Sequence, residues 1–336
     1  MAKPRSALAD FSIYLAIRVF VCIIQTLSFS AALAFARGLA WLAFRIDRRH
    51  RQVALDNLEK AFPDRYTLAQ RQELVRDVYR HFCSVLIEII HMPRRLNVFN
   101  WKDHLELPEG HRIVECLLSG RPLLVVTGHF GNWEMAGYCL GLLGFPTHAI
   151  ARPLDNSFLD NYLRRFREAT GQKILAKHGD FAKIQGVLDK GGVLATLGDQ
   201  DAGQRGLFVD FFGRPASTFK SIALLSLEYR APIFVFGAAR TGWPMQYRVY
   251  FEDLILPEDY AFCPDAHAPS PSVTPRLWNV SSAATPNNTS GCTAAGSINP
   301  PNLASAPHKW TGTFLEKVLP MIVTLQLSPL QGLCAC

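Results

Sequence analysis

Short apolar runs recur along the middle of the chain, with helical stretches between them. The runs cover residues 121–129, 147–153, 192–199 and 231–240, and a further run, 246–254, alternates apolar and polar residues as a strand near an edge does. Apolar residues at helical spacing mark 53–64, 68–92, 132–144, 157–171, 181–191 and 219–230. Strands that alternate with helices predict an α/β fold with a mainly parallel, mixed sheet flanked by helices.

Polar side chains follow several of these predicted strands. His129, Arg152 and Asp199 each come directly after one. Because ligands of such sheets bind at the carboxyl ends of the strands, we expect these three side chains to face one crevice.

An uncharged stretch of 18 residues, 19–36, precedes the predicted sheet. It is just long enough for a membrane-spanning helix. Arginines 37, 45, 48, 49 and 51 follow it, so the positive-inside rule places the rest of the chain in the cytoplasm. We therefore expect a membrane anchor over 1–45 and the α/β domain over 46–260. A secretory signal peptide and a helix lying in the membrane interface are the alternatives.

Composition narrows the choice of partner. The net charge is +7, and 49% of the residues are hydrophobic. The positive charge favours an anionic partner, such as a membrane surface, an acidic carrier protein, a phosphorylated substrate or nucleic acid. The eight cysteines include no CxxC pair and no Cys/His cluster at zinc spacing, so we expect neither a disulfide framework nor a metal site.

The first apolar run ends in the sequence GHFGNWE, which holds His129 and Glu134. Two residues five apart on one helix point about 140° away from each other. They meet only if His129 lies in the turn after the strand and Glu134 lies in the first helical turn. A carboxylate on one imidazole nitrogen makes the other a better base, as general base catalysis requires. The alternative is a structural histidine at a helix start.

Several spaced segments resemble one protein family. GHFGNWE, ARPLDNSFLDNYLRRFREATG and LGDQDAGQRGLFVDFFGRPAST stand in the order found in the bacterial lipid A biosynthesis acyltransferases, the lauroyl/myristoyl transferases. These belong to the wider HxxxxD/E acyltransferases, and the resemblance covers about residues 10–260. It implies an inner-membrane enzyme with a cytoplasmic catalytic domain. That enzyme would move a fatty acyl chain from acyl carrier protein to a hydroxyl of a lipid A precursor, a phosphorylated glycolipid.

The resemblance also implies roles for individual residues. His129 would be the general base and Glu134 would orient it, while Arg152 and Arg167 would bind the acceptor or its phosphate. The resemblance calls for no cofactor, and we expect no nucleic-acid partner. The other expected substrate-binding residues are Asn132 in the first motif, Arg164 on the same helix face as Arg167, and Asp199. Asp199 and Asp201 would organise the site, for example by pairing with an arginine. Phe208, Phe211 and Phe212 are candidates for an acyl channel or for ordinary core positions.

The resemblance stops after about Tyr260, where the composition shifts to Pro, Ser, Ala, Thr and Asn. Family members usually end in a segment like PEQYxWLHRR. Read one base out of frame, the codons of 285–295 can encode that segment. In the same frame the codons of 272–279 can encode RYTAALE, whose glutamate Trp278-Asn279 must give. We therefore expect a frameshift between Tyr260 and Ser272, with an atypical tail over 261–336; a disordered native tail is the alternative.

Three main functional hypotheses follow, and a metal-dependent hydrolase is a weaker fourth because too few ligands cluster. The first is a lipid A acyltransferase, and the second keeps the chemistry with a lysophospholipid or another glycolipid as acceptor. The third is a catalytically inactive member of the family that serves as a membrane-bound interaction protein, because the altered ending removes part of the family pattern.

Overall fold

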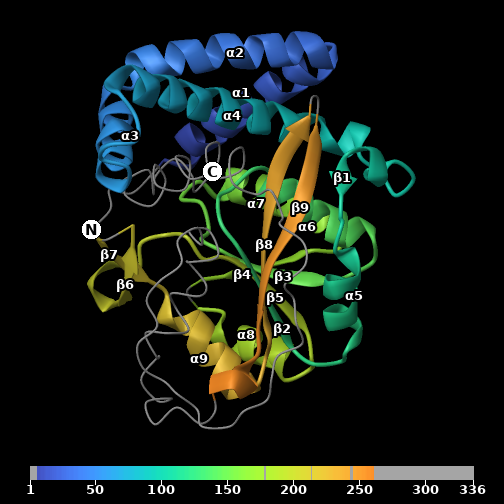
Figure 1. The fold of residues 1–336 in the computed structure, drawn as a ribbon. Helices are drawn as coiled ribbons and strands as arrows, with labels where there is room; N and C mark the ends of the chain where they lie inside the picture. Colours follow the sequence, from blue (N-terminus) through green and yellow to red (C-terminus); the bar gives the residue numbers. More distant parts are fainter. Residues whose placement is uncertain (1–5, 178, 213, 243–244, 261–336) are drawn as a thin grey trace.

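A seven-stranded sheet forms the centre of the molecule (Figure 1). The computed structural model describes residues 6–260, apart from 178, 213 and 243–244. The strand order is β1-β9-β8-β2-β5-β3-β4. The strands are β1 (Leu105–Glu106), β2 (Leu123–Thr127), β3 (Thr147–Ala151), β4 (Lys173–Ala176), β5 (Val193–Leu197), β8 (Ile233–Gly242) and β9 (Gln246–Ile255). Neighbours pair in parallel except for β8 and β9, so the predicted mainly parallel, mixed sheet is confirmed.

The two remaining strands, β6 (Leu207–Phe211) and β7 (Arg214–Thr218), pair with each other outside this sheet. These strands contain or flank the three phenylalanines, Phe208, Phe211 and Phe212, that were candidates for an acyl channel or for core positions. Phe211 and Phe212 pack into a core cluster with α3 (Arg48–Ala61) and α4 (Leu68–Arg95), and Phe208 is exposed. Phe211 and Phe212 therefore occupy ordinary core positions, which was one of the two alternatives.

Both faces of the sheet are covered, as expected for parallel strands with continuous apolar runs. Leu124 and Val126 of β2 pack with the helices α8 (Phe181–Leu188) and α9 (Lys220–Tyr229). Leu123 and Val125 point to the other face, where α5 (Gly110–Leu118) packs on them. The further helices beside the sheet are α6 (Trp133–Leu142) and α7 (Ser157–Glu168).

The apolar N-terminal region is two helices, not the single helix expected over 19–36. Helix α1 (Ala7–Thr26) ends, and α2 (Phe29–Ile46) begins after an extended Leu27 and Ser28. The Ser28 hydroxyl accepts a hydrogen bond from the Ala31 N–H at 3.3 Å, so it caps the second helix. A serine cap inside an apolar run has broken the expected helix.

Each of these two helices is long and apolar enough to cross a membrane, on length and composition alone. A signal sequence or the core helix of a soluble protein passes the same test. Most of α1 is nevertheless exposed, and its large exposed apolar side chains include Leu8, Phe11, Ile13, Leu15, Val19 and Ile23. This surface fits membrane association.

Helix α4 connects this N-terminal layer to the sheet (Figure 1). Thr67 and Gln70 begin it with a capping box, which fixes its amino end. One side of α4 packs on α1 and α2 in a common core, and another side carries Glu88 toward β8 and β9. The expected frameshift and tail, 261–336, lie outside the described residues.

Candidate active site

His129 and Asp199 meet where two parallel strands end. In the register of β2 and β5, Thr127 lies beside Leu197, so the turns that follow these strands are neighbours. The Asp199 carboxylate accepts the backbone N–H of His129 at 2.6 Å and lies 2.8 Å from its Nδ1. Both side chains are buried, with exposures of 7% and 4%. The carboxylate thus fixes both the backbone and the ring of His129.

This contact determines the tautomer of the imidazole. An ionised carboxylate only accepts hydrogen bonds, so Nδ1 of His129 carries the proton and Nε2 carries a lone pair. The indole of Trp133 packs edge-on against the same ring, with centroids 4.9 Å apart. The arrangement gives a buried imidazole with one nitrogen able to take a proton from a bound hydroxyl.

Glu134 lies in the first turn of α6, as expected, but its carboxylate does not take the expected place on His129. It binds Arg167 of α7 through two hydrogen bonds, one from Nε at 3.0 Å and a second from Nη2. Asp199 occupies the position at Nδ1 that we expected Glu134 to fill. Likewise, the partner of Asp199 is a histidine rather than an arginine.

A cavity of about 700 Å³ opens beside this pair of side chains. Five of the seven predicted site residues line it: His129, Glu134, Arg152, Arg164 and Arg167. Asp199 lies behind His129, outside the lining. Arg164 donates to the Ile174 carbonyl at 3.0 Å, so it also ties α7 to the sheet. The cavity wall therefore carries three arginines near one buried histidine.

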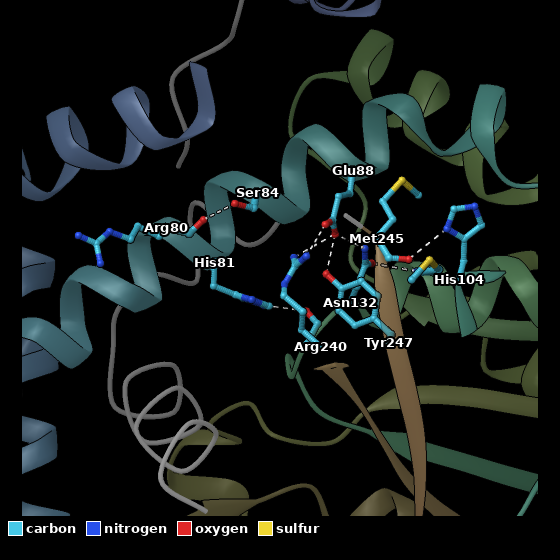
Figure 2. A network of polar contacts seen from close by, with 11 residues as sticks. Arg80, His81, Ser84, Glu88, His104, Asn132, Arg240, Met245 and Tyr247 are labelled. Carbon is cyan, nitrogen blue, oxygen red and sulfur yellow. Dashed lines mark hydrogen bonds and ion pairs between the residues drawn. The ribbon is translucent and has the colours of Figure 1, made fainter. Parts of the chain in front are cut away.

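Asn132, expected to bind substrate, does not line this cavity and is fully buried. Its Oδ1 accepts the N–H of Met135 at 3.0 Å and so caps α6, while its Nδ2 donates to Glu88 at 3.2 Å. Figure 2 shows the network around this contact. The fully buried Glu88 also accepts from Arg240, at 2.5 and 3.1 Å, and from the Tyr247 hydroxyl at 2.5 Å.

Glu88, Arg240 and Tyr247 were not predicted from the sequence. One signal was available, because Glu88 is a lone acid within the apolar stretch SVLIEIIHM. A buried carboxylate requires donors, and those donors tie α4, β8 and β9 to the helix that begins shortly after His129. The network therefore holds in place the turn that carries His129, between β2 and α6.

The same turn is held from a second direction. Nε2 of His81 on α4 donates to the Gly131 carbonyl at 3.0 Å (Figure 2). Burial, together with the charge of Arg240, lowers the pKa of His81 to about 4, so His81 stays neutral. Gly131 has φ +60, and a Cβ there would lie 1.5 Å from the Ala238 carbonyl oxygen. A glycine is required at this position by both conformation and contact.

These features define a class of site. A buried histidine–aspartate pair at the carboxyl ends of parallel strands, beside a cavity walled by arginines, suits proton transfer at a bound anionic substrate. Comparison with known proteins then gives the family. The chain belongs to the bacterial lipid A biosynthesis acyltransferases, whose family model matches residues 2–255.

A curated relative is the phosphatidylinositol mannoside acyltransferase of Mycolicibacterium smegmatis (strain ATCC 700084 / mc(2)155). The two are 27% identical over 156 residues, which is 45% of this chain and 51% of the relative. The matched part thus spans about half the length of that relative.

Proposed function

We propose that this protein transfers a fatty acyl chain from the thioester of acyl carrier protein to a hydroxyl of a phosphorylated glycolipid. The observation that carries the proposal is the buried His129–Asp199 pair beside the cavity, in a chain of an acyltransferase family. The three arginines of the cavity wall suit an acceptor with phosphate groups, because guanidinium binds phosphate bidentately.

His129 acts as the general base. Its Nε2 takes the proton from the acceptor hydroxyl as the oxygen attacks the thioester carbonyl. The tetrahedral intermediate collapses, the carbon–sulfur bond breaks, and the thiolate takes the proton back from Nε2. The products are the acyl ester and the free thiol, and no acyl-enzyme forms. Asp199 stabilises the imidazolium between these steps.

Glu134 and Arg167 act as a unit of their own, apart from the His129–Asp199 pair. Their two hydrogen bonds join α6 to α7, and both residues line the cavity. In this proposal they shape the wall that receives the acceptor, and the more exposed Arg152 contacts its phosphate.

The acceptor is a lipid A precursor or a related glycolipid. The family description favours the first. The named substrate of the mycobacterial relative, phosphatidylinositol mannoside, favours the second, since it also combines phosphate and sugar. Helices α1 and α2, followed by a run of arginines, support placement at the inner membrane with the site on the cytoplasmic side.

One assay tests the proposal. The full chain in detergent is given acyl carrier protein thioesters with a lipid A precursor, phosphatidylinositol mannoside or a lysophospholipid. We expect transfer to a phosphorylated glycolipid and a loss of about 10²–10⁴ in kcat for His129→Ala. Unchanged transfer by that variant would overturn the assignment of the base. Absence of transfer to every acceptor would favour an inactive family member, and sequencing of the coding DNA across 260–272 tests the expected frameshift.

A further inference from the structure

Two cationic side chains stand next to each other at the ends of neighbouring strands. The register of β3 and β4 aligns Ala151 with Ala176, and the N–H of Lys177 donates to the Ala151 carbonyl at 3.1 Å. Arg152 and Lys177 are therefore the first residues after two adjacent parallel strands. Both line the cavity that contains His129. Arg152 was predicted from the sequence as a binding residue, and Lys177 was not.

Like charges held next to each other repel, and this repulsion is relieved when an anion lies between them. Within the part of the chain that the structure describes, Lys177 has no ion-pair partner. The carboxylate paired with Arg152 is Asp155, 3.9 Å away, and both side chains are largely exposed. The fold thus places two positive charges together without a closely bound carboxylate to neutralise them.

The acids on the cavity wall do not supply that compensation. Glu134 is bound by Arg167. Asp160 accepts the N–H of Leu154 at 2.8 Å, and Asp201 accepts the N–H of Gly203 at 2.9 Å. The fourth acid, Glu228, belongs to α9 and pairs with neither cation among the described residues. The other three carboxylates likewise form no ion pair with Arg152 or Lys177 among the described residues.

The surroundings of Lys177 also bear on anion binding. Lys177 is an exposed residue whose ammonium lies over the ring of Phe219, 4.1 Å from the centroid. Burial and the charge of Arg152 both lower the pKa of Lys177. A cation that is partly desolvated beside another cation is stabilised when an anion binds between them.

We propose that Arg152 and Lys177 together bind a phosphoryl group of the substrate. This inference rests on the proposed function and adds Lys177 to it. The guanidinium offers a planar pair of donors and the ammonium a compact charge, which suits a group with up to two negative charges. Two sources carry such a group: the headgroup of the acceptor, and the phosphodiester that joins the thiol arm to acyl carrier protein.

The test uses the full chain with Lys177→Met, which keeps most of the length of the side chain and removes the charge. Transfer is measured with acceptors that carry or lack the phosphate, and with donors that carry or lack the phosphodiester (acyl carrier protein or an N-acetylcysteamine thioester). We expect KM for one phosphorylated substrate to rise at least about tenfold, while its unphosphorylated counterpart is unaffected. The substrate that responds identifies the source. Lys177→Arg should restore most of the loss.

Lys190→Met is the matched control, because Lys190 is exposed after α8 and does not line the cavity. A direct binding measurement accompanies the kinetics: inorganic phosphate should raise the thermal unfolding midpoint of the wild type and of Lys190→Met, but not of Lys177→Met. Equal midpoint shifts in all three proteins, or equal KM changes with and without phosphate, would overturn the inference. If no substrate pair supports transfer, the proposed function fails, and the phosphate-induced shift still decides the role of Lys177.

Discussion

The carboxylate of Asp199 holds His129 at two points, the backbone N–H and the ring Nδ1. Asp199→Asn keeps the shape of the side chain, but its amide also presents a donor, so it no longer fixes the tautomer that leaves a lone pair on Nε2. We expect kcat for acyl transfer to fall by about 10²–10⁴, with little change in KM. Asp189→Asn, at an exposed position outside the cavity, is the control and should retain wild-type kinetics. An Asp199→Asn protein with full kcat would contradict this role.

Glu134 and Arg167 form a partly buried ion pair, and removal of either leaves the other uncompensated. We expect Glu134→Gln and Arg167→Met each to cost about 2–4 kcal/mol of unfolding free energy. The double variant should be no less stable than the poorer single variant, which a double-mutant cycle measures. If Glu134 instead acted directly on His129, Glu134→Gln would alter the pH dependence of transfer as Asp199→Asn does, and the cycle would show additivity.

Glu88 is fully buried and accepts from Arg240, Tyr247 and Asn132. Glu88→Gln removes the charge that Arg240 requires, so we expect a loss of about 3–5 kcal/mol in unfolding free energy. Glu73→Gln on the same helix breaks an exposed pair with Arg76 and should cost less than about 1 kcal/mol. Thermal unfolding in detergent compares the two, and equal midpoints would exclude a stabilising role for the network.

Gly131 combines a positive φ with backbone contact to Ala238. Gly131→Ala should therefore destabilise the fold by more than the roughly 1–2 kcal/mol of conformational strain alone. Gly144→Ala separates the two effects, since Gly144 has φ +84 and an added methyl group there would meet none of the described atoms within 4 Å. We expect the loss at position 131 to exceed the loss at 144 in chemical or thermal unfolding. Similar losses would show that the contact with Ala238 is easily relaxed.

His81 predicts a pH dependence of stability. The ordinary pKa of 6.5 applies to the unfolded chain, while burial and Arg240 lower the folded value to about 4. Between these values the unfolded chain binds a proton that the folded protein does not, so stability is complete above about pH 6.5 and is lost as the pH falls toward 4. The loss reaches up to about 3 kcal/mol. Thermal midpoints measured from pH 7 to 4 should fall less steeply for His81→Gln than for the wild type.

The fold class was predictable because the strands of the sheet are buried on both faces. Continuous apolar runs such as 121–129 and 231–240 therefore marked β2 and β8 directly. The short strand β4, in the sequence KILA, was missed, since four residues after a helix give little periodicity. The order of the strands and the break at Ser28 depend on tertiary packing and on one capping hydroxyl, and neither leaves a periodic signal.

The location of the candidate site was predictable from the sequence, but the pairs of residues within it were not. Because His129, Arg152 and Asp199 each follow a predicted strand, the sequence predicted that they lie at one edge of the sheet. Sequence distance then favoured Glu134 as the partner of His129, whereas the parallel register of β2 and β5 brings Asp199 to it from 70 residues away. Arg152 and Lys177 depend on register in the same way, because they become neighbours only when β3 and β4 pair in this alignment.

The contact between Gly131 and Ala238 also decides which part of the protein can adapt to its ligand. The turn that carries His129 rests against the backbone of β8, so it cannot retreat to make room, and Asp199 prevents the ring from swinging away. In the proposed function, the imidazole is therefore a fixed point to which each substrate is brought. Under the same proposal, differences in substrate size would be accommodated across the cavity, where the exposed side chains of Phe181 and Leu224 form part of the wall.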